Sequence, residues 1–228
     1  MAVKQKTDIS MPEVLFTGGG DAAADRRVLR LAEQGQLRRL YQGGYTSNLA
    51  SPPDAVVTRN WLNIVGHLLS GGVISYRSAR DAKPSAGRLY VTRGQRPRTI
   101  ELPGLTVRVL PGPGAVTGDV AYKDMFLASQ ARWLLENMAT GRGVGERVLR
   151  AEDLEAQLDK MLLIRGEHRF NELRENCRAL VMRSRLDKNT GEWKDQNNQA
   201  GATVFVDHTL GQGTLREGFF GRLKTEVS

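Results

Sequence analysis

Cysteine is almost missing from this 228-residue chain, which contains a single one, Cys177. One cysteine excludes an internal disulfide framework and any metal site built from several thiolates. Aromatic residues make up only 6% of the chain, and no apolar run approaches the roughly 20 residues that a membrane-spanning helix needs. The first ten residues, MAVKQKTDIS, lack the apolar stretch of a signal peptide. We therefore expect a soluble protein of the cytoplasm that does not associate with membranes.

Motifs that carry catalysis are equally scarce. The sequence contains no Gly-rich phosphate loop ending in Lys-Ser/Thr, no G-x-S-x-G nucleophile elbow and no His-Glu-x-x-His zinc motif. The three histidines, His67, His168 and His208, lie far apart and have no cysteine or carboxylate at ligand spacing. Carboxylate pairs such as Glu152 and Asp153 are typical of a solvated helix surface. We predict a protein that is not an enzyme and uses no cofactor or metal.

Positive charge, in contrast, is abundant and unevenly placed. Lys and Arg number 33 against 25 acidic residues, and residues 1–120 carry 16 basic and 9 acidic residues against 17 and 16 in residues 121–228. Thirteen of the first 16 basic residues are Arg, whose planar guanidinium suits phosphate groups and guanine edges. A phosphate-binding surface would explain the asymmetry. The codon usage of a high-GC genome would explain the preference for Arg over Lys equally well.

Residues 21–35, DAAADRRVLRLAEQG, predict a helix with Asp21 as N-cap and Gly35 just past its end. The apolar face consists of Ala24, Val28, Leu31 and Ala32. The opposite face consists of Arg26, Arg27, Arg30 and Gln34. The preceding residues 1–20 end in three glycines and have no helical or alternating pattern, so they predict a flexible break.

Residues 37–45 predict a small basic β-hairpin that follows this helix at once. Leu37, Arg39 and Tyr41 alternate with Arg38 and Leu40 before a turn at Gly43-Gly44. A basic helix followed by a basic hairpin is typical of a winged helix, in which the helix lies in a DNA groove and the hairpin touches the backbone. A charged surface helix beside an ordinary hairpin fits the spacing equally well.

The rest of the chain predicts an α+β fold. Residues 51–54, SPPD, predict a stiff boundary, and residues 55–69 predict a buried helix that includes Trp61 and His67. The further predicted elements are a strand from Gly72, strands of a small, mostly antiparallel sheet within 88–110, a helix over 125–138 and two helical stretches within 152–182 separated by Gly166. The predicted domains are 1–50 (a partial winged helix), 51–140 (mixed α/β), 141–186 (helical) and 187–228 (a polar tail).

Four stretches within residues 25–180 carry a family resemblance when taken in order. They read LAEQGQLRRLYQGGYTSNL, SPPDAVVTRNWLNIVGHLLSGGVISYRSA, a strand block ending LPGLTVRVLPGPGAVTGD, and FLASQARWLLENM followed by AEDLEAQLDKMLLIRGEHRFNELR. Together they resemble the AbiEi family of type IV antitoxins, including the versions of that module found upstream of Fic domains. The likeness rests on the order and spacing of many weak positions rather than on one diagnostic motif.

The resemblance implies a winged-helix DNA-binding domain followed by a mixed α/β domain. Such a protein represses its own operon by binding operator DNA and acts as the antidote to a partner toxin. The positions implied to face DNA are Arg26, Arg27 and Arg30 on the helix and Arg38, Arg39 and Tyr41 on the hairpin.

Two features depart from the family pattern. Residues 1–20 are too short and too Gly-rich to supply the helices that precede a recognition helix, and residues 197–223 look like the start of a Fic-type region. The His-Pro-Phe…Gly-Asn-Gly-Arg loop of Fic enzymes does not occur in the sequence. The alternative interpretation is therefore a regulatory protein-interaction module, the front portion of a Fic-family protein, that restrains a toxin or Fic-type enzyme without binding DNA.

Overall fold

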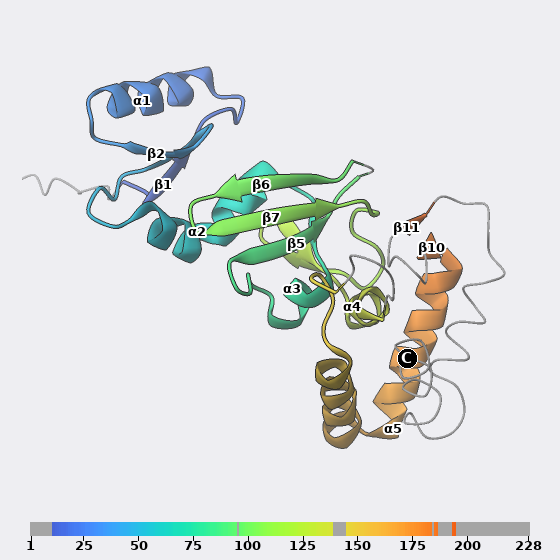
Figure 1. Ribbon diagram of the computed structural model, residues 1–228. Helices are drawn as coiled ribbons and strands as arrows, with labels where there is room; N and C mark the ends of the chain where they lie inside the picture. The colour runs from blue at the N-terminus through green and yellow to red at the C-terminus, as the bar shows by residue number, and fades with distance from the viewer. Residues whose placement is uncertain (1–10, 95, 139–144, 184, 187–192, 195–228) are drawn as a thin grey trace, which may run out of the picture. The chain divides into compact units, whose positions relative to one another are not determined.

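The protein is an α+β chain, and its computed structural model (Figure 1) divides it into two compact units. The described residues are 11–94, 96–138, 145–183, 185–186 and 193–194. Unit 1 comprises the chain up to Ser70 together with Glu101–Thr106, and unit 2 comprises Gly71–Ile100 and the chain from Val107 onward.

Unit 1 contains a three-stranded sheet and two helices. Its elements in chain order are β1 (Val14–Phe16), α1 (Ala22–Glu33), β2 (Arg38–Tyr41), β3 (Gly44–Thr46) and α2 (Pro53–Leu68). The sheet order is β1-β3-β2, and β3 pairs antiparallel with both neighbours. The short central strand β3 therefore joins two segments that are separated in the sequence by the whole of α1.

Helix α1 begins and ends where the sequence predicts. The side chain of Asp21 accepts hydrogen bonds from the backbone N–H groups of Ala23 (2.9 Å) and Ala24 (3.1 Å), which caps the first turn. At the other end Gly35 has a φ of 72°, a conformation that favours glycine. Val28 is buried, and it packs with partly buried Leu31, whereas Ala24, which we predicted to face inward, is exposed.

Strand β1 corrects the prediction that residues 1–20 form only a flexible break. Val14 pairs with Thr46 and Phe16 pairs with Gly44, so this segment is a strand of the sheet beneath α1. The carboxylate of Glu13, just before β1, accepts hydrogen bonds from Arg59 and Asn60 of α2. These contacts connect β1 to α2 across more than 40 residues of sequence. A local sequence pattern cannot predict a contact between segments so far apart.

The β2–β3 hairpin forms as predicted, but its alternation is broken. The pairing shifts between Arg39 and Tyr41, so that Leu40 occupies a β-bulge and is buried. Gly43 has a φ of 87° and lies in the turn, whereas Gly44 is required for space. A Cβ atom on Gly44 would lie 2.2 Å from the ring of Tyr41.

Helix α2 confirms the helix predicted over 55–69 and begins with proline at its first position. Its inward side is fully buried at Val56, Ile64 and Val65. His67 stacks on Phe16 of β1 with ring centroids 4.4 Å apart, which gives this histidine a packing role within unit 1. Trp61 is only partly buried, so it is not a central core residue.

Unit 2 is built on a six-stranded sheet of order β6-β7-β5-β4-β9-β8, whose β6–β7 turn belongs to unit 1. The strands are β4 (Val73–Ile74), β5 (Arg88–Thr92), β6 (Arg98–Leu102), β7 (Leu105–Leu110), β8 (Val120–Tyr122) and β9 (Met125–Leu127). The helices are α3 (Tyr76–Asp81), α4 (Gln130–Asn137) and α5 (Ala151–Arg183), and a two-stranded pair is formed by β10 (Arg185–Leu186) and β11 (Trp193–Lys194). Strand β4 pairs antiparallel with β5 and parallel with β9.

The predicted helix over 125–138 is wrong in its first part. Residues Met125–Leu127 form β9, and the helix begins only at Gln130. The N–H of Ser129 donates to Asp119, and the hydroxyl of Ser129 accepts from the N–H of Arg132, which caps α4. The strand is stabilised by a parallel partner about 50 residues earlier in the chain, so periodicity alone could not separate it from the helix.

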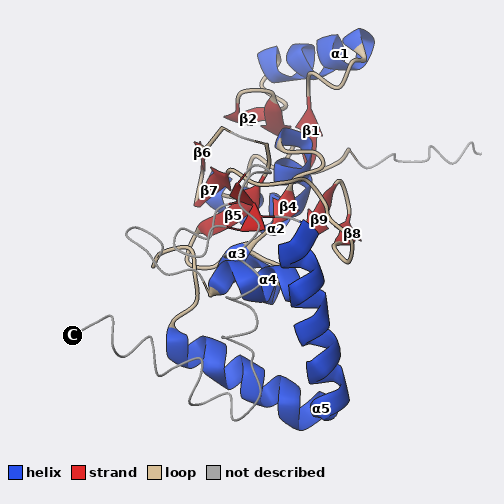
Figure 2. Ribbon diagram, turned by 90° about the vertical axis from the view of Figure 1, so that its right-hand side faces the viewer, coloured by secondary structure: helices blue, strands red, loops and turns tan. Residues whose placement is uncertain are grey.

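One hydrophobic cluster of unit 2 joins α4 to both halves of α5. Gly166 interrupts α5 with φ 74° and ψ 171°, a conformation essentially restricted to glycine, which confirms the predicted division into two helical stretches. The bend is visible in Figure 2. Both halves contribute buried side chains to one cluster with α4, namely Leu154, Leu158, Met161, Leu173, Cys177 and Leu180.

The units differ from the domains that the sequence predicts. The boundary predicted at residues 51–54 instead lies within unit 1, because α2 packs with β1. The predicted tail, residues 187–228, lies outside the described residues apart from β11. Among the described helices, none combines the length and the apolar character that crossing a bilayer requires.

Candidate nucleic-acid interface

Three of the predicted DNA-facing arginines lie on the solvent side of α1. Arg26, Arg27 and Arg30 are all exposed. The Nε of Arg26 donates to the carbonyl of Ala22 at 3.1 Å, a contact within the helix that leaves the rest of its guanidinium toward solvent. Within the described part of the chain, none of the three forms an ion pair. Their positive charge is therefore not cancelled by an adjacent carboxylate contact.

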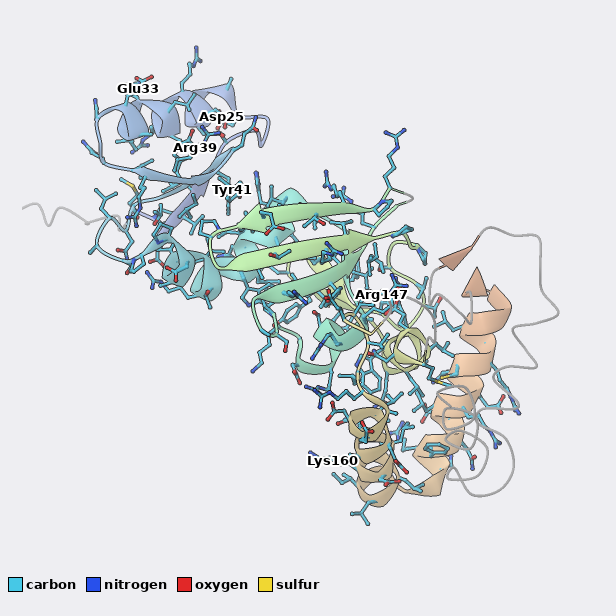
Figure 3. The ribbon with its side chains drawn as sticks, in the orientation of Figure 1. Asp25, Glu33, Arg39, Tyr41, Arg147 and Lys160 are labelled. Carbon is cyan, nitrogen blue, oxygen red and sulfur yellow. The ribbon has the colours of Figure 1, made fainter. Side chains whose placement is uncertain are left out.

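The helix that carries these arginines is held on a fixed support. Val28 and Leu31 of α1 pack with Leu37 and Tyr45 of the hairpin. The carboxylate of Asp25 accepts a hydrogen bond from the N–H of Gly18 (2.9 Å), so it secures the β1–α1 connection. In Figure 3 Glu33 points away from the sheet at the end of α1. The sheet and these contacts together fix the orientation of the basic face.

Arg39 adds a fourth exposed guanidinium from a neighbouring element. It lies on β2, beneath α1 in Figure 3, and its Nε donates to the carbonyl of Tyr41 at 3.3 Å. Its other nitrogens make no ion pair among the described residues. Arg39 and the three arginines of α1 thus form what we call the unit 1 basic face: Arg26, Arg27, Arg30 and Arg39.

Arg38, the neighbour of Arg39, is engaged inside unit 1. It is partly buried, and its Nη2 donates to the carbonyls of Asn48 (3.3 Å) and Ser51. These bonds close the loop that connects β3 to α2. We therefore assign Arg38 a structural role and leave it out of the basic face.

Tyr41 is also poorly placed for a phosphate contact. Its ring packs against Gly44, and its buried hydroxyl oxygen has no hydrogen-bond partner among the described residues. Burial raises the pKa of the Tyr41 hydroxyl far above its usual range. A hydroxyl enclosed in this way does not reach a ligand in solvent, so Tyr41 supports the hairpin from within.

The support of the basic face depends on an ionised carboxylate. Hydrogen bonds from Arg59, Asn60 and Asn48 lower the pKa of Glu13 from about 4.5 to about 2. Because this pKa is depressed in the folded protein, the carboxylate contributes stability above about pH 4.5 and loses it as the pH falls towards 2.

The variant Glu13→Gln tests this anchor. We expect it to be less stable than the wild-type protein at pH 7 and the difference to shrink progressively between pH 4.5 and pH 2. Thermal unfolding followed by circular dichroism across this range measures the effect. Glu33→Gln, which removes an exposed carboxylate, is the control; a pH-independent difference for Glu13→Gln would refute the role of ionisation.

A second group of charged side chains is fully buried in unit 2. The guanidinium of Arg132 contacts the carboxylates of Asp119 (2.7 Å) and Glu136 (2.9 Å) and the hydroxyl of Thr92 (2.6 Å). Glu136 also accepts a hydrogen bond from the N–H of Tyr76 at 3.0 Å. The side chains of Arg132, Asp119 and Glu136 are 0% exposed, so a substrate has no access to them. This cluster joins α4 to the loop before β8 and to the start of α3, and we interpret it as structural.

A small pocket of about 120 Å³ lies between α4 and the halves of α5. Its lining includes Gln130, Met161 and the ion pair of Arg169 with Glu172, whose closest atoms are 2.8 Å apart. An amide, a thioether and a paired arginine do not form a nucleophile with an adjacent base. The described residues also contain no group of three or more His, Cys, Asp or Glu side chains that could hold a metal ion.

Comparisons with known proteins do not extend this account. No family model matches the sequence, and neither the curated proteins nor the solved structures contain a significant match. The unit 1 basic face and its support are therefore the observations on which a function must rest.

Proposed function

We propose that unit 1 binds the backbone of duplex DNA through its basic face and that the chain acts as an antitoxin-like transcriptional regulator without catalysis of its own. One observation carries the proposal: four exposed arginines that form no ion pair with any described residue are presented by α1 and by β2, a strand of the sheet on which α1 packs. Guanidinium groups set against phosphates release condensed counterions, and this release supplies most of the free energy of non-specific DNA binding.

The order of elements in unit 1 supports the same proposal. A strand, a basic helix and a hairpin, with the first strand paired to the last, correspond to the second half of a winged helix. On this hypothesis the exposed face of α1 approaches a groove and the β2–β3 turn lies near the backbone. Strand β1 supports α1 from within the same sheet, because it pairs with β3.

The regulatory part of the proposal comes from the resemblance to AbiEi antitoxins. The resemblance suggests an operator close to the gene as the DNA target and a cognate toxin, or a Fic-type protein, as the second partner. A sequence-specific contact requires side chains at base edges, and Arg26 and Arg30 on the outer side of α1 are the candidates.

Removing the charge of the helix tests DNA binding by unit 1. We expect the combined variant Arg26→Gln, Arg27→Gln and Arg30→Gln to bind a labelled duplex from the upstream region roughly 500-fold more weakly at 0.1 M salt, because each of the three lost phosphate contacts costs about eightfold. Fluorescence anisotropy measures the affinity.

The matched control is Arg80→Gln, Arg150→Gln and Arg169→Gln, which removes the same charge from exposed positions of unit 2. Both variants should keep the thermal stability of the wild-type protein within about 0.5 kcal/mol, since exposed substitutions rarely exceed that value. Equal losses of affinity in both variants would show that only net charge matters, against the proposed interface.

A second candidate function, a protein-interaction module that does not bind DNA, is favoured by one surface feature. Leu163 and Ile164, just before the bend of α5 at Gly166, are 87% and 67% exposed. Adjacent exposed apolar side chains are typical of a contact with another protein. Absence of duplex binding by the wild-type chain, together with a complex with the product of the neighbouring gene, would favour this function.

A further inference from the structure

A second group of exposed arginines lies in unit 2. We call it the unit 2 arginine patch, and its members are Arg93, Arg96, Arg98 and Arg108. All four side chains are exposed, and none of them makes an ion pair in the described part of the chain.

The strand order brings these arginines to one end of the sheet. Arg93 directly follows β5, Arg98 begins β6, and β7 lies between those two strands (Figure 1). The N–H of Arg93 donates to the carbonyl of Leu110 at the end of β7 (3.1 Å). The Nη1 of Arg108 donates to Thr99 of β6 (3.2 Å). Strand pairing therefore places Arg93 and Arg108, whereas Arg96 lies in the connection between β5 and β6.

The segment that contains Arg93, Arg96 and Arg98 carries no negative charge. Residues 82–100 include five basic residues and no Asp or Glu. Glu101, the next carboxylate along the chain, accepts a hydrogen bond from Thr106 and makes no ion pair with the patch. Like charges gathered at one strand end repel each other, and a bound polyanion relieves that repulsion.

We propose that the unit 2 arginine patch is a phosphate-binding surface for the backbone of duplex DNA, distinct from the unit 1 basic face. Two strand spacings, roughly 10 Å, separate the strands of Arg93 and Arg98. This span reaches more than one phosphate of a strand that rises about 3.4 Å per nucleotide. The patch contains arginine rather than lysine, and the guanidinium fork matches two phosphate oxygens at once.

The role of the patch is to raise affinity and not to select sequence. Its arginines stand on strand ends and a connection, and the described part of the patch offers no helix that could enter a groove. Contacts of this kind position a protein on the duplex and make binding depend on salt. The proposal extends the function proposed for unit 1, but it has its own residues and its own test.

The test compares two charge-removed variants on a generic labelled duplex by fluorescence anisotropy at a series of salt concentrations. The patch variant is Arg93→Gln, Arg96→Gln and Arg98→Gln, and the matched control is Arg80→Gln, Arg150→Gln and Arg169→Gln. We expect the patch variant to lose roughly 500-fold in affinity at 0.1 M salt. The slope of log K against log salt should become shallower by about 2.7, which is 0.9 for each of three contacts.

The outcomes separate this inference from the proposed function of unit 1. A patch variant with the wild-type slope and affinity overturns the inference, and so does a control variant with the same loss. If the patch variant loses binding while Arg26→Gln, Arg27→Gln and Arg30→Gln together have no effect, the inference stands and the unit 1 interface fails. A wild-type chain that does not bind the duplex contradicts both.

Discussion

Replacing Arg132 with alanine should lower the free energy of unfolding of unit 2 by about 3–5 kcal/mol, the loss measured when one member of a buried ion pair is removed. The side chain is 0% exposed and bridges Asp119 and Glu136. These two carboxylates hold the pKa of Arg132 above its usual value although burial opposes ionisation. Without the guanidinium, the buried carboxylates of Asp119 and Glu136 lose the ion pairs that Arg132 makes with them.

Urea unfolding followed by circular dichroism measures this loss, and Arg150→Ala, at an exposed position, is the control. Replacing these three residues by apolar ones, as in Arg132→Met with Asp119→Leu and Glu136→Leu, should restore much of the stability because the three buried charges are removed together. A stability of Arg132→Ala within about 0.5 kcal/mol of the wild-type value would show that the cluster is not buried as described.

Trp133→Ala should be the second strongly destabilising substitution, by about 3–5 kcal/mol. Trp133 lies on α4, is only 5% exposed and belongs to the core cluster of unit 2. Trp61→Ala should cost clearly less, because Trp61 is only partly buried. The apolar pattern of the sequence alone favoured Trp61 as a core residue. Comparing Trp133→Ala with Trp61→Ala therefore tests the burial seen in the structure against the burial expected from the sequence.

The two tryptophan variants are compared by urea unfolding under the same conditions, with circular dichroism as the signal because fluorescence changes with each substitution. The structure predicts that Trp133→Ala unfolds at a much lower urea concentration than Trp61→Ala. The reverse order would mean that the cores of the two units are assigned incorrectly.

The parts of the fold that local chemistry determines could be predicted from the sequence. Asp21 and Gly35 mark the ends of α1, and Gly166 marks the bend in α5. Strand β1 and strand β9 could not be predicted, because each has three residues and is stabilised by a distant partner. Their pairing with β3 and β4 is a property of the folded chain and not of their own residues.

In the candidate site, too, some features follow from the local sequence and others depend on contacts between distant residues. The exposure of Arg26, Arg27 and Arg30 follows from helical spacing, because Val28 and Leu31 define the opposite side of α1. The inward roles of Arg38 and Tyr41 could not be predicted, since they depend on the bulge at Leu40 and on loop carbonyls that follow β3.

The buried position of Arg132 had no local signal either. With Glu136 it forms an i,i+4 pair, which is typical of a solvated helix surface. Only the packing of α4 against the sheet and the loop before β8 excludes water from that pair. A charged pair four residues apart therefore predicts a salt bridge but not its burial.

The central claim is that the basic face of unit 1 binds the phosphate backbone of DNA, and the salt dependence of duplex binding by the wild-type chain tests it most directly. With three or more phosphate contacts, log K should fall against log salt with a slope of about −2.7 or steeper. The slope should become shallower by about 2.7 in the combined variant Arg26→Gln, Arg27→Gln and Arg30→Gln, because three phosphate contacts are removed. A flat slope, or no binding at low salt, would contradict the account.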